Sequence, residues 1–158
     1  MEEKTNVMRL LDQKKIKYNS YCYVETGETN GQKVAEILGQ DENRVFKTLV
    51  TVGKTKANYV FVIPVNKELD LKKAAKAVGE KSIEMLKAKD LLSLTGYIHG
   101  GCSPIGMKKF FKTTIHETAK EYETIFFSAG KVGYQVEVSP TDLAKIIRYD
   151  FANLISEQ

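Results

Sequence analysis

The chain has 158 residues, of which 42% are hydrophobic and 28% are charged, and its formal net charge is +4 at neutral pH. This length fits one domain with a sizeable core, and the composition is ordinary for a globular protein. No run approaches the roughly 18 apolar residues that a transmembrane helix needs, so we expect no membrane association. The mild positive charge permits an anionic partner without requiring one.

Two cysteines and two histidines are too few for a disulfide framework or a typical zinc site. Neither a Cys-x-x-Cys nor a His-x-x-x-His pair occurs, and we expect no metal or other cofactor. The first 15 residues mix acidic and basic side chains and contain no apolar segment of the signal-peptide kind. The expected location is therefore the reducing cytoplasm.

Near the N-terminus, two segments with helical spacing flank a strand. Thr5 can cap the first helix, and residues 16–23 mix aromatic and polar side chains as strands do. The segment 25–31 is rich in turn residues. The second helix follows it and is expected to end at Gly39, because glycine readily adopts the left-handed conformation that closes a helix.

The middle of the chain predicts a hairpin followed by a helix. The runs 45–52 and 59–65 are strand-like and are joined by a plausible turn. Asp70 then caps an amphipathic helix that Gly79 ends. The residues expected on its inner face are Leu71, Ala74, Ala75 and Val78.

The second half adds a short helix over 88–94 and several strands. Ser139 and Pro140 predict the start of a last helix. Because strands and helices do not alternate strictly, the expected fold class is α+β with a mostly central sheet. The strands expected here are 113–115, 124–128 and 134–138. The inward-facing residues expected in the last helix are Leu143, Ile146 and Ile147.

Lys47 lies inside the strand 45–52, in which both faces are largely apolar. We expect such a strand to be buried on both sides, where an ammonium group is costly to bury without a partner. That partner can be a carboxylate, the mouth of a cavity or an anionic ligand. Alternatively, Lys47 protects a sheet edge from pairing with another chain.

The segment 96–106, GYIHGGCSPIG, is the most informative part of the sequence. Gly100 and Gly101 leave backbone N–H groups uncovered, and such groups can bind a phosphate, a carboxylate or the oxyanion of a reacting ester. Ser103 adds a hydroxyl. The alternative is a structural turn. The segment 128–133 is similar but lacks the spacing of a Walker A loop, and a hairpin turn is its simpler interpretation.

A basic cluster follows the first glycine-rich segment, with no acidic residue inside it. A solvated surface is one meaning of such a cluster, and contact with an anionic ligand is the other. Its members are Lys108, Lys109 and Lys112.

Cys102 and His99 are close enough in sequence to suggest a thiol nucleophile with a histidine base. Spacing alone does not show that the two side chains meet. A buried cysteine also packs as a small hydrophobic residue. No Gly-x-Ser-x-Gly motif supports a serine hydrolase.

Together these segments resemble the YbaK/EbsC family of free-standing aminoacyl-tRNA deacylases, which is related to the editing insertion of bacterial prolyl-tRNA synthetase. The chain looks similar to the branch that hydrolyses Cys-tRNA(Pro). The resemblance covers nearly the whole sequence, so we expect residues 1–158 to form one editing domain. The motifs that carry it are Lys47-Thr48-Leu49, residues 69–73 with Gly79, residues 96–109, residues 128–133 and residues 142–145.

The resemblance implies a mixed, barrel-like β-sheet surrounded by helices, with the aminoacyl-adenosine end of a tRNA in a pocket. It implies no cofactor and no protein nucleophile. The thiol of the mischarged cysteine attacks its own ester carbonyl and releases a cyclic thioester and free tRNA. Cys-tRNA(Cys) is a second expected substrate. Prolyl-tRNA synthetase is an expected partner, whereas DNA is not.

Each matching residue also receives an implied role. Lys47 would orient the 3′-terminal nucleotide, and the N–H groups of Gly100 and Gly101 would face the ester carbonyl; these three form the implied catalytic set. Tyr21 competes with Tyr23 for one place at the pocket wall. The implied substrate-binding residues are Tyr23, Thr48, Ser103, Ser128, Gly130 and Gln135. The implied tRNA-binding residues are Lys108, Lys109 and Lys131.

Two positions depart from the family pattern. The branch often has a phenylalanine before the second helix, where this chain has Asn30-Gly31, and an aspartate where this chain has Gln135. Both would lie near the aminoacyl group, so they bear on amino-acid specificity. Two other functions stay open: a non-catalytic tRNA- or nucleotide-binding relative, and a hydrolase built on Cys102 and His99.

Overall fold

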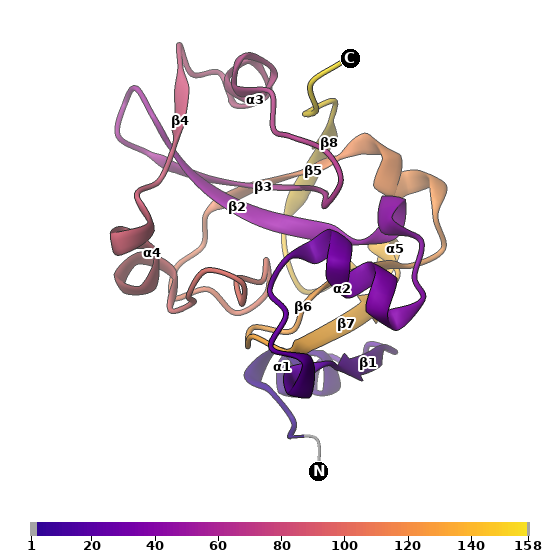
Figure 1. Cartoon of the computed structure of the whole chain (residues 1–158). Helices are drawn as coiled ribbons and strands as arrows, with labels where there is room; N and C mark the ends of the chain where they lie inside the picture. Colours follow the sequence, from indigo (N-terminus) through magenta and orange to yellow (C-terminus); the bar gives the residue numbers. More distant parts are fainter. Residues whose placement is uncertain (1–2, 158) are drawn as a thin grey trace.

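The computed structural model describes residues 3–157, whose strands form two sheets (Figure 1). The larger sheet has the order β4-β2-β3-β5-β8. Neighbours among β4, β2 and β3 are antiparallel, whereas β3, β5 and β8 run parallel. Its strands are β2 (Phe46–Gly53), β3 (Asn58–Pro64), β4 (Ile83–Met85), β5 (Lys112–His116) and β8 (Tyr149–Ala152).

The smaller sheet is antiparallel and has the order β1-β7-β6. Its strands are β1 (Asn19–Cys22), β6 (Ile125–Ser128) and β7 (Tyr134–Val138). The α-helices are α1 (Asn6–Gln13), α2 (Gly31–Leu38), α3 (Leu71–Val78), α4 (Ala88–Thr95) and α5 (Pro140–Leu143). Short 3-10 helices are η1 (Val24–Thr26), η2 (Glu42–Arg44) and η3 (Glu117–Glu121).

The predicted helix ends are confirmed at the first three α-helices. Thr5 accepts the Met8 N–H at 3.3 Å and begins α1. Asp70 accepts the N–H groups of Lys72 and Lys73 and begins α3. Gly39 and Gly79 close α2 and α3 in the left-handed conformation, which other residues adopt only with strain.

The hydrophobic core fills both faces of β3. Val60 and Val62 pack in the main cluster, which also contains residues of α1, β2, β5, β6 and β7. Phe61 and Ile63 point the other way and pack beneath α3, against Ala74 and Ala75. The strand buried on both sides is therefore β3. β2 is only partly buried, because residues 47–49 keep some exposure.

The α+β class and the mixed sheet are confirmed, but the barrel is not closed: the strands divide into two sheets. The hairpin of β2 and β3 forms as predicted. The strand expected over 16–23 shortens to β1, because a left-handed Lys15 (φ 57°) and an Ile16 N–H bonded to the Leu11 C=O extend the turn after α1.

The last predicted helix is wrong in extent. α5 stops at Leu143, and the chain then turns into β8, which pairs with β5. The Ser139 side chain makes no capping bond. Leu143 is buried as expected, but Ile146 and Ile147 are only partly buried. Leu71, expected on the inner face of α3, is 40% exposed because it begins the helix ahead of its packed turn.

Buried His116 predicts a pH dependence of stability. Its Nδ1 accepts the Leu154 N–H at 3.1 Å, and burial lowers the pKa of the imidazole below its ordinary value. As pH falls through about 6.5, the unfolded chain takes up a proton that the folded chain excludes, so stability is lost by at most about 1.4 kcal/mol per pH unit. His116→Asn keeps an acceptor and should flatten this slope. Urea denaturation between pH 7.5 and 5.5 measures it, and an unchanged slope contradicts the assignment.

Candidate functional site

The main cavity of interest lies where β2 and β6 separate. Val45, the residue before β2, forms an isolated parallel bridge with Phe126 of β6. Along the same edge of β2, pairing with β4 begins only at Thr51. A cavity of about 370 Å³ opens along this stretch, lined by Val45, by residues 46–50 of β2 and by Phe127 and Ser128 of β6. We call it the interstrand cavity.

Helices and loops complete its walls with apolar side chains. Val34 of α2 and Leu91 of α4 face the cavity, as do Met85 and Leu86 at the end of β4. The mixture of apolar walls and few polar groups is typical of sites for small organic groups.

Thr48 turns polar groups toward this cavity. The Val45 C=O accepts the Val65 N–H on the β3 side, whereas the Val50 C=O accepts the Leu86 N–H on the other side. Backbone groups of successive strand residues alternate in direction, so the N–H and C=O of Thr48 face the cavity edge. Its buried Oγ1 has no hydrogen-bond partner among the described residues, and a bound ligand could supply one.

Lys47 brings a cation to the same wall. It lines the interstrand cavity and is half-buried, and no carboxylate of residues 3–157 lies within salt-bridge distance of its Nζ. Burial lowers the pKa of the Lys47 ammonium, and the charge of Glu68 opposes that shift. Of the partners expected from the sequence, the cavity mouth is the one present, and it leaves the charge available to an anion.

The glycine pair contributes one free N–H, not two. The Gly101 N–H donates to the Ile98 C=O at 3.0 Å within the loop. A Cβ on Gly101 would lie 3.0 Å from the Val132 backbone nitrogen, so this glycine allows the two glycine-rich segments to pack together. Gly100 lines the interstrand cavity, and its N–H has no acceptor in the described part of the chain.

Three more predicted residues line the cavity. Tyr23 is one of them, whereas Tyr21 lies elsewhere and donates its hydroxyl to Glu137 at 2.7 Å. Burial raises the pKa of Tyr23. The Ser128 hydroxyl accepts the Gly130 N–H at 3.1 Å and retains its own proton for donation. Gln135 lines the wall and is bonded to Gln40.

Comparison with known proteins shows to which family a chain with this cavity belongs. The model of the aminoacyl-tRNA editing domain family matches residues 25–146. The chain belongs to this family. An Enterococcus faecalis protein named "Putative Cys-tRNA(Pro)/Cys-tRNA(Cys) deacylase EbsC" is 48% identical over 158 residues, covering 99% of this chain and 96% of that protein.

Two weaker likenesses agree with this membership of the editing domain family. "Uncharacterized protein YwhH" of Bacillus subtilis is 25% identical over 127 residues, which cover 80% of each chain. The crystal structure of "a putative trans-editing enzyme for prolyl tRNA synthetase" has a TM-score of 0.81 at 22% identity, and the match covers 96% of this chain and 95% of that chain. At such identity the structural likeness shows the fold alone.

Several residues implied by the family resemblance lie outside the interstrand cavity of this editing domain. Ser103 is fully buried, and its hydroxyl accepts the Ile105 N–H at 3.3 Å. Gly130 has φ 89°, and a Cβ there would lie 2.9 Å from Val7. Both residues therefore shape loops rather than line the cavity.

The three implied tRNA-binding lysines are exposed and also lie outside the cavity. Lys108 donates to the Ser93 C=O at 3.4 Å and lies across Gly96 at the end of α4. Lys131 pairs with Glu3. Lys109 is exposed just outside the loop.

Cys102 and His99 both line the interstrand cavity, but they do not form a nucleophile pair. No hydrogen bond joins them among residues 3–157. Burial raises the pKa of the Cys102 thiol to about 12, which keeps it protonated, and a thiol attacks esters as its thiolate. The packing interpretation of this cysteine fits its burial better than the catalytic one.

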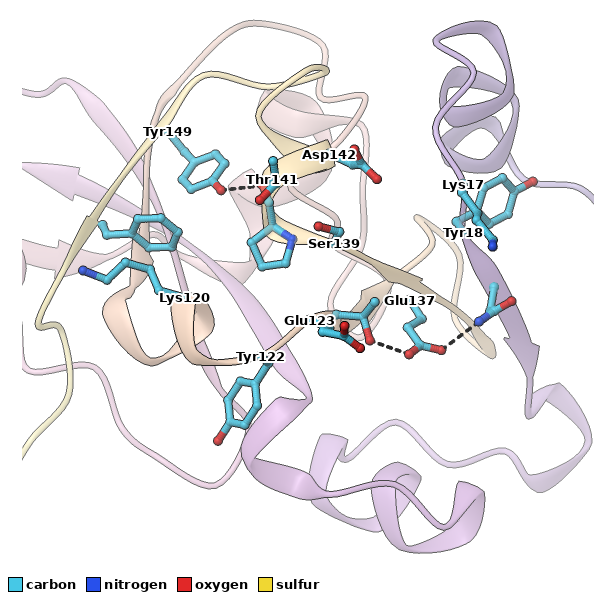
Figure 2. A pocket seen from close by; sticks show the side chains of 14 residues that line it. Lys17, Tyr18, Lys120, Tyr122, Glu123, Glu137, Ser139, Thr141, Asp142 and Tyr149 are labelled. Carbon is cyan, nitrogen blue, oxygen red and sulfur yellow. Dashed lines mark hydrogen bonds between the residues drawn. The ribbon is translucent and has the colours of Figure 1, made fainter.

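A larger cavity of about 710 Å³ lies on another part of the editing domain (Figure 2). It includes Tyr149, Asp142 and Glu137. Glu137 is satisfied by Asn19, Tyr21, Thr124 and Arg44, while Asp142 pairs with Lys145. Because two of its three carboxylates serve structural pairs and Asp142 is the one residue of the family motifs that it includes, we do not regard it as the functional site.

Two further observations concern the described residues as a whole. No group of three or more His, Cys, Asp and Glu side chains between residues 3 and 157 is arranged to hold a metal ion. None of the helices in that range combines the length and the apolar character needed to cross a bilayer.

Sequence reasoning missed the residues that α2, β4 and α4 contribute. Val34 and Leu91 follow helical spacing, so they could be assigned to a buried face but not to a cavity. β4 has three residues and a central glutamate, too short a pattern to predict a strand. Gln40 follows a helix C-cap, and no local signal indicates its partner.

We expect the burial of Lys47 to lower the stability of the editing domain while serving its function. Because burial disfavours its charge, Lys47→Met should raise the free energy of unfolding by roughly 0.5–1 kcal/mol, as substitutions at functional sites can. Lys54→Met, in the exposed turn after β2, should leave it unchanged. Urea denaturation at pH 7 compares the two. A loss of stability in the Lys47 variant would show that the lysine is structural.

Proposed function

We propose that this editing domain is a trans-editing deacylase that removes cysteine from Cys-tRNA(Pro), with Cys-tRNA(Cys) as a second substrate. The observation that carries the proposal is that the interstrand cavity is lined both by the half-buried Lys47, which has no salt bridge within residues 3–157, and by Thr48, whose buried hydroxyl has no hydrogen-bond partner there. The name of the 48% identical relative supports the substrate. Residues 1–158 would act as one domain in the cytoplasm.

Lys47 would contact both parts of an aminoacyl-adenosine. Besides the interstrand cavity, it lines an adjoining cavity of about 650 Å³ whose other residues are mostly polar, among them Asn66 and Lys67. The buried Oδ1 of Asn66 has no partner in the described residues. The aminoacyl group would occupy the apolar cavity, and the terminal nucleotide the polar one, with its negative charge near Lys47.

The chemistry would use the substrate's own thiol. Its sulfur attacks the ester carbonyl, the new C–S bond forms as the C–O bond to the ribose breaks, and the thiol proton ends on the ribose oxygen. The products are a cyclic thioester and free tRNA. The Gly100 N–H and the Ser128 hydroxyl would stabilise the developing oxyanion, for which one donor is worth roughly 100- to 1000-fold in rate.

The charge distribution supports an RNA partner. The segment 85–112 contains five lysines and one acidic residue, Asp90, so its net charge of +4 equals that of the whole chain. It also borders the interstrand cavity through Met85, Leu91 and Gly100. Lysines here, including Lys108 and Lys109, would contact tRNA phosphates. Lys131, paired with Glu3, would contribute once that pair opens. Prolyl-tRNA synthetase is the proposed source of the mischarged tRNA.

A deacylation panel tests the proposal. Wild-type protein should release cysteine from Cys-tRNA(Pro) much faster than the amino acid from Ala-, Ser- or Pro-tRNA. Lys47→Ala should lower the rate at least 100-fold, because the substrate loses its charged anchor, whereas Cys102→Ser should stay within about threefold of wild type. Released amino acid and surviving aminoacyl-tRNA are measured together.

Two outcomes contradict this function. Tight binding of tRNA without cleavage of any ester in the panel would identify a non-catalytic binding protein. Loss of activity in folded Cys102→Ser would instead assign the chemistry to the thiol and restore the Cys102/His99 hypothesis. Circular dichroism of each variant checks that it is folded.

A further inference from the structure

Gln40 and Gln135 form a reciprocal pair at the wall of the interstrand cavity. Gln40 Nε2 donates to Gln135 Oε1 at 2.7 Å, and Gln135 Nε2 donates to Gln40 Oε1 at 3.0 Å. Gln135 is 3% exposed and lines the cavity, whereas Gln40 does not line it. Gln40 therefore acts on the cavity only through its partner.

The fold fixes Gln40 in this position. Gly39 ends α2 in the left-handed conformation (φ 67°), and the Gln40 N–H then donates to the Ala35 C=O at 2.8 Å. Four residues later, Arg44 pairs with Glu137, two positions along β7 from Gln135. The segment 40–44 is thus attached to β7 at both ends by polar contacts. It joins the wall formed by α2 to the wall formed by β7.

The pairing leaves Gln135 with a defined set of free groups. A primary amide has two N–H donors and two acceptor positions. The reciprocal pair uses one of each, so one acceptor and one donor of Gln135 remain. Without Gln40, nothing in the described structure holds the Gln135 amide in place, since its two hydrogen bonds are both to that residue.

We propose that Gln40 is a positioning residue for substrate selection. It holds Gln135 so that the side-chain carbonyl of Gln135 accepts a hydrogen bond from the α-amino group of the aminoacyl ester. This inference rests on the proposed function. Every aminoacyl ester carries that amino group, so a fixed acceptor would set the depth and direction in which the side chain enters the cavity. Small side chains would then be distinguished by where their reactive atom lies.

Methionine substitutions separate this role from a structural one. Gln40→Met keeps the volume but removes both hydrogen bonds to Gln135. Gln40→Met/Gln135→Met replaces the whole pair by apolar groups, which need not destabilise the protein. Gln13→Met, at an exposed position of α1 outside the cavities, is the matched control.

The readouts are kcat and KM for Cys-tRNA(Pro) and Ala-tRNA(Pro), and the dissociation constants of amide-linked cysteinyl- and alanyl-3′-amino-adenosine. Gln40→Met should raise KM and the cysteinyl-analogue dissociation constant about tenfold, with kcat within about twofold, because an amine contact made equally in ground and transition states changes KM alone. The ratio of kcat/KM for Cys-tRNA(Pro) to kcat/KM for Ala-tRNA(Pro) should fall. The double variant should be no worse than Gln135→Met, since the two residues act as one unit.

Three results overturn the inference. Wild-type KM and wild-type preference in Gln40→Met would show that the pair does not face substrate. A lower melting temperature as the sole change would show that it is structural. Additive losses in the double variant would show independent roles. If wild-type protein binds the analogues but cleaves no ester, the proposed function fails, and the analogue affinities still decide the role of Gln40.

Discussion

The incomplete pairing of β2 is the constraint on which the rest of the site depends. β3 covers one edge of this strand throughout, but the other edge is paired only at its two ends, by the bridge to Phe126 and by β4 from Thr51 onward. The unpaired stretch presents Thr48 to a cavity instead of to another strand. A closed barrel would fill this space with a ladder of backbone hydrogen bonds, so the opening between the sheets and the candidate site are the same feature.

The groups that line the cavity are suited to bind and orient a ligand, and none of those described is an activated nucleophile. Lys47 supplies a charge whose burial is unfavourable in the free protein, and an anionic ligand would relieve that cost. The buried Cys102 thiol is held protonated. The free donors among the described residues include the Gly100 N–H and the Ser128 hydroxyl. Such a site suits a substrate that carries its own nucleophile, since it needs to be held in a reactive geometry.

Short sequence patterns were enough to predict the features that depend on neighbouring residues alone. The caps at Thr5, Asp70, Gly39 and Gly79, the hairpin and the position of Lys47 on a strand all follow from short-range preferences. Long-range contacts were not accessible in this way. Gln40 meets Gln135 across 95 positions, and the Gly101 N–H is used within its own loop, which glycine content could not show. α5 ends early because β8 pairs with β5, a competition between tertiary and local preference.

The central claim is that the space between β2 and β6 receives the aminoacyl group. A crystal structure of the protein with amide-linked cysteinyl-3′-amino-adenosine tests it most directly. We expect the cysteinyl group in the interstrand cavity, within hydrogen-bond distance of Thr48 or Gly100, and the nucleotide on the Lys47 and Asn66 side. An analogue bound instead in the cavity beside Tyr149, or with adenosine between β2 and β6, would contradict it.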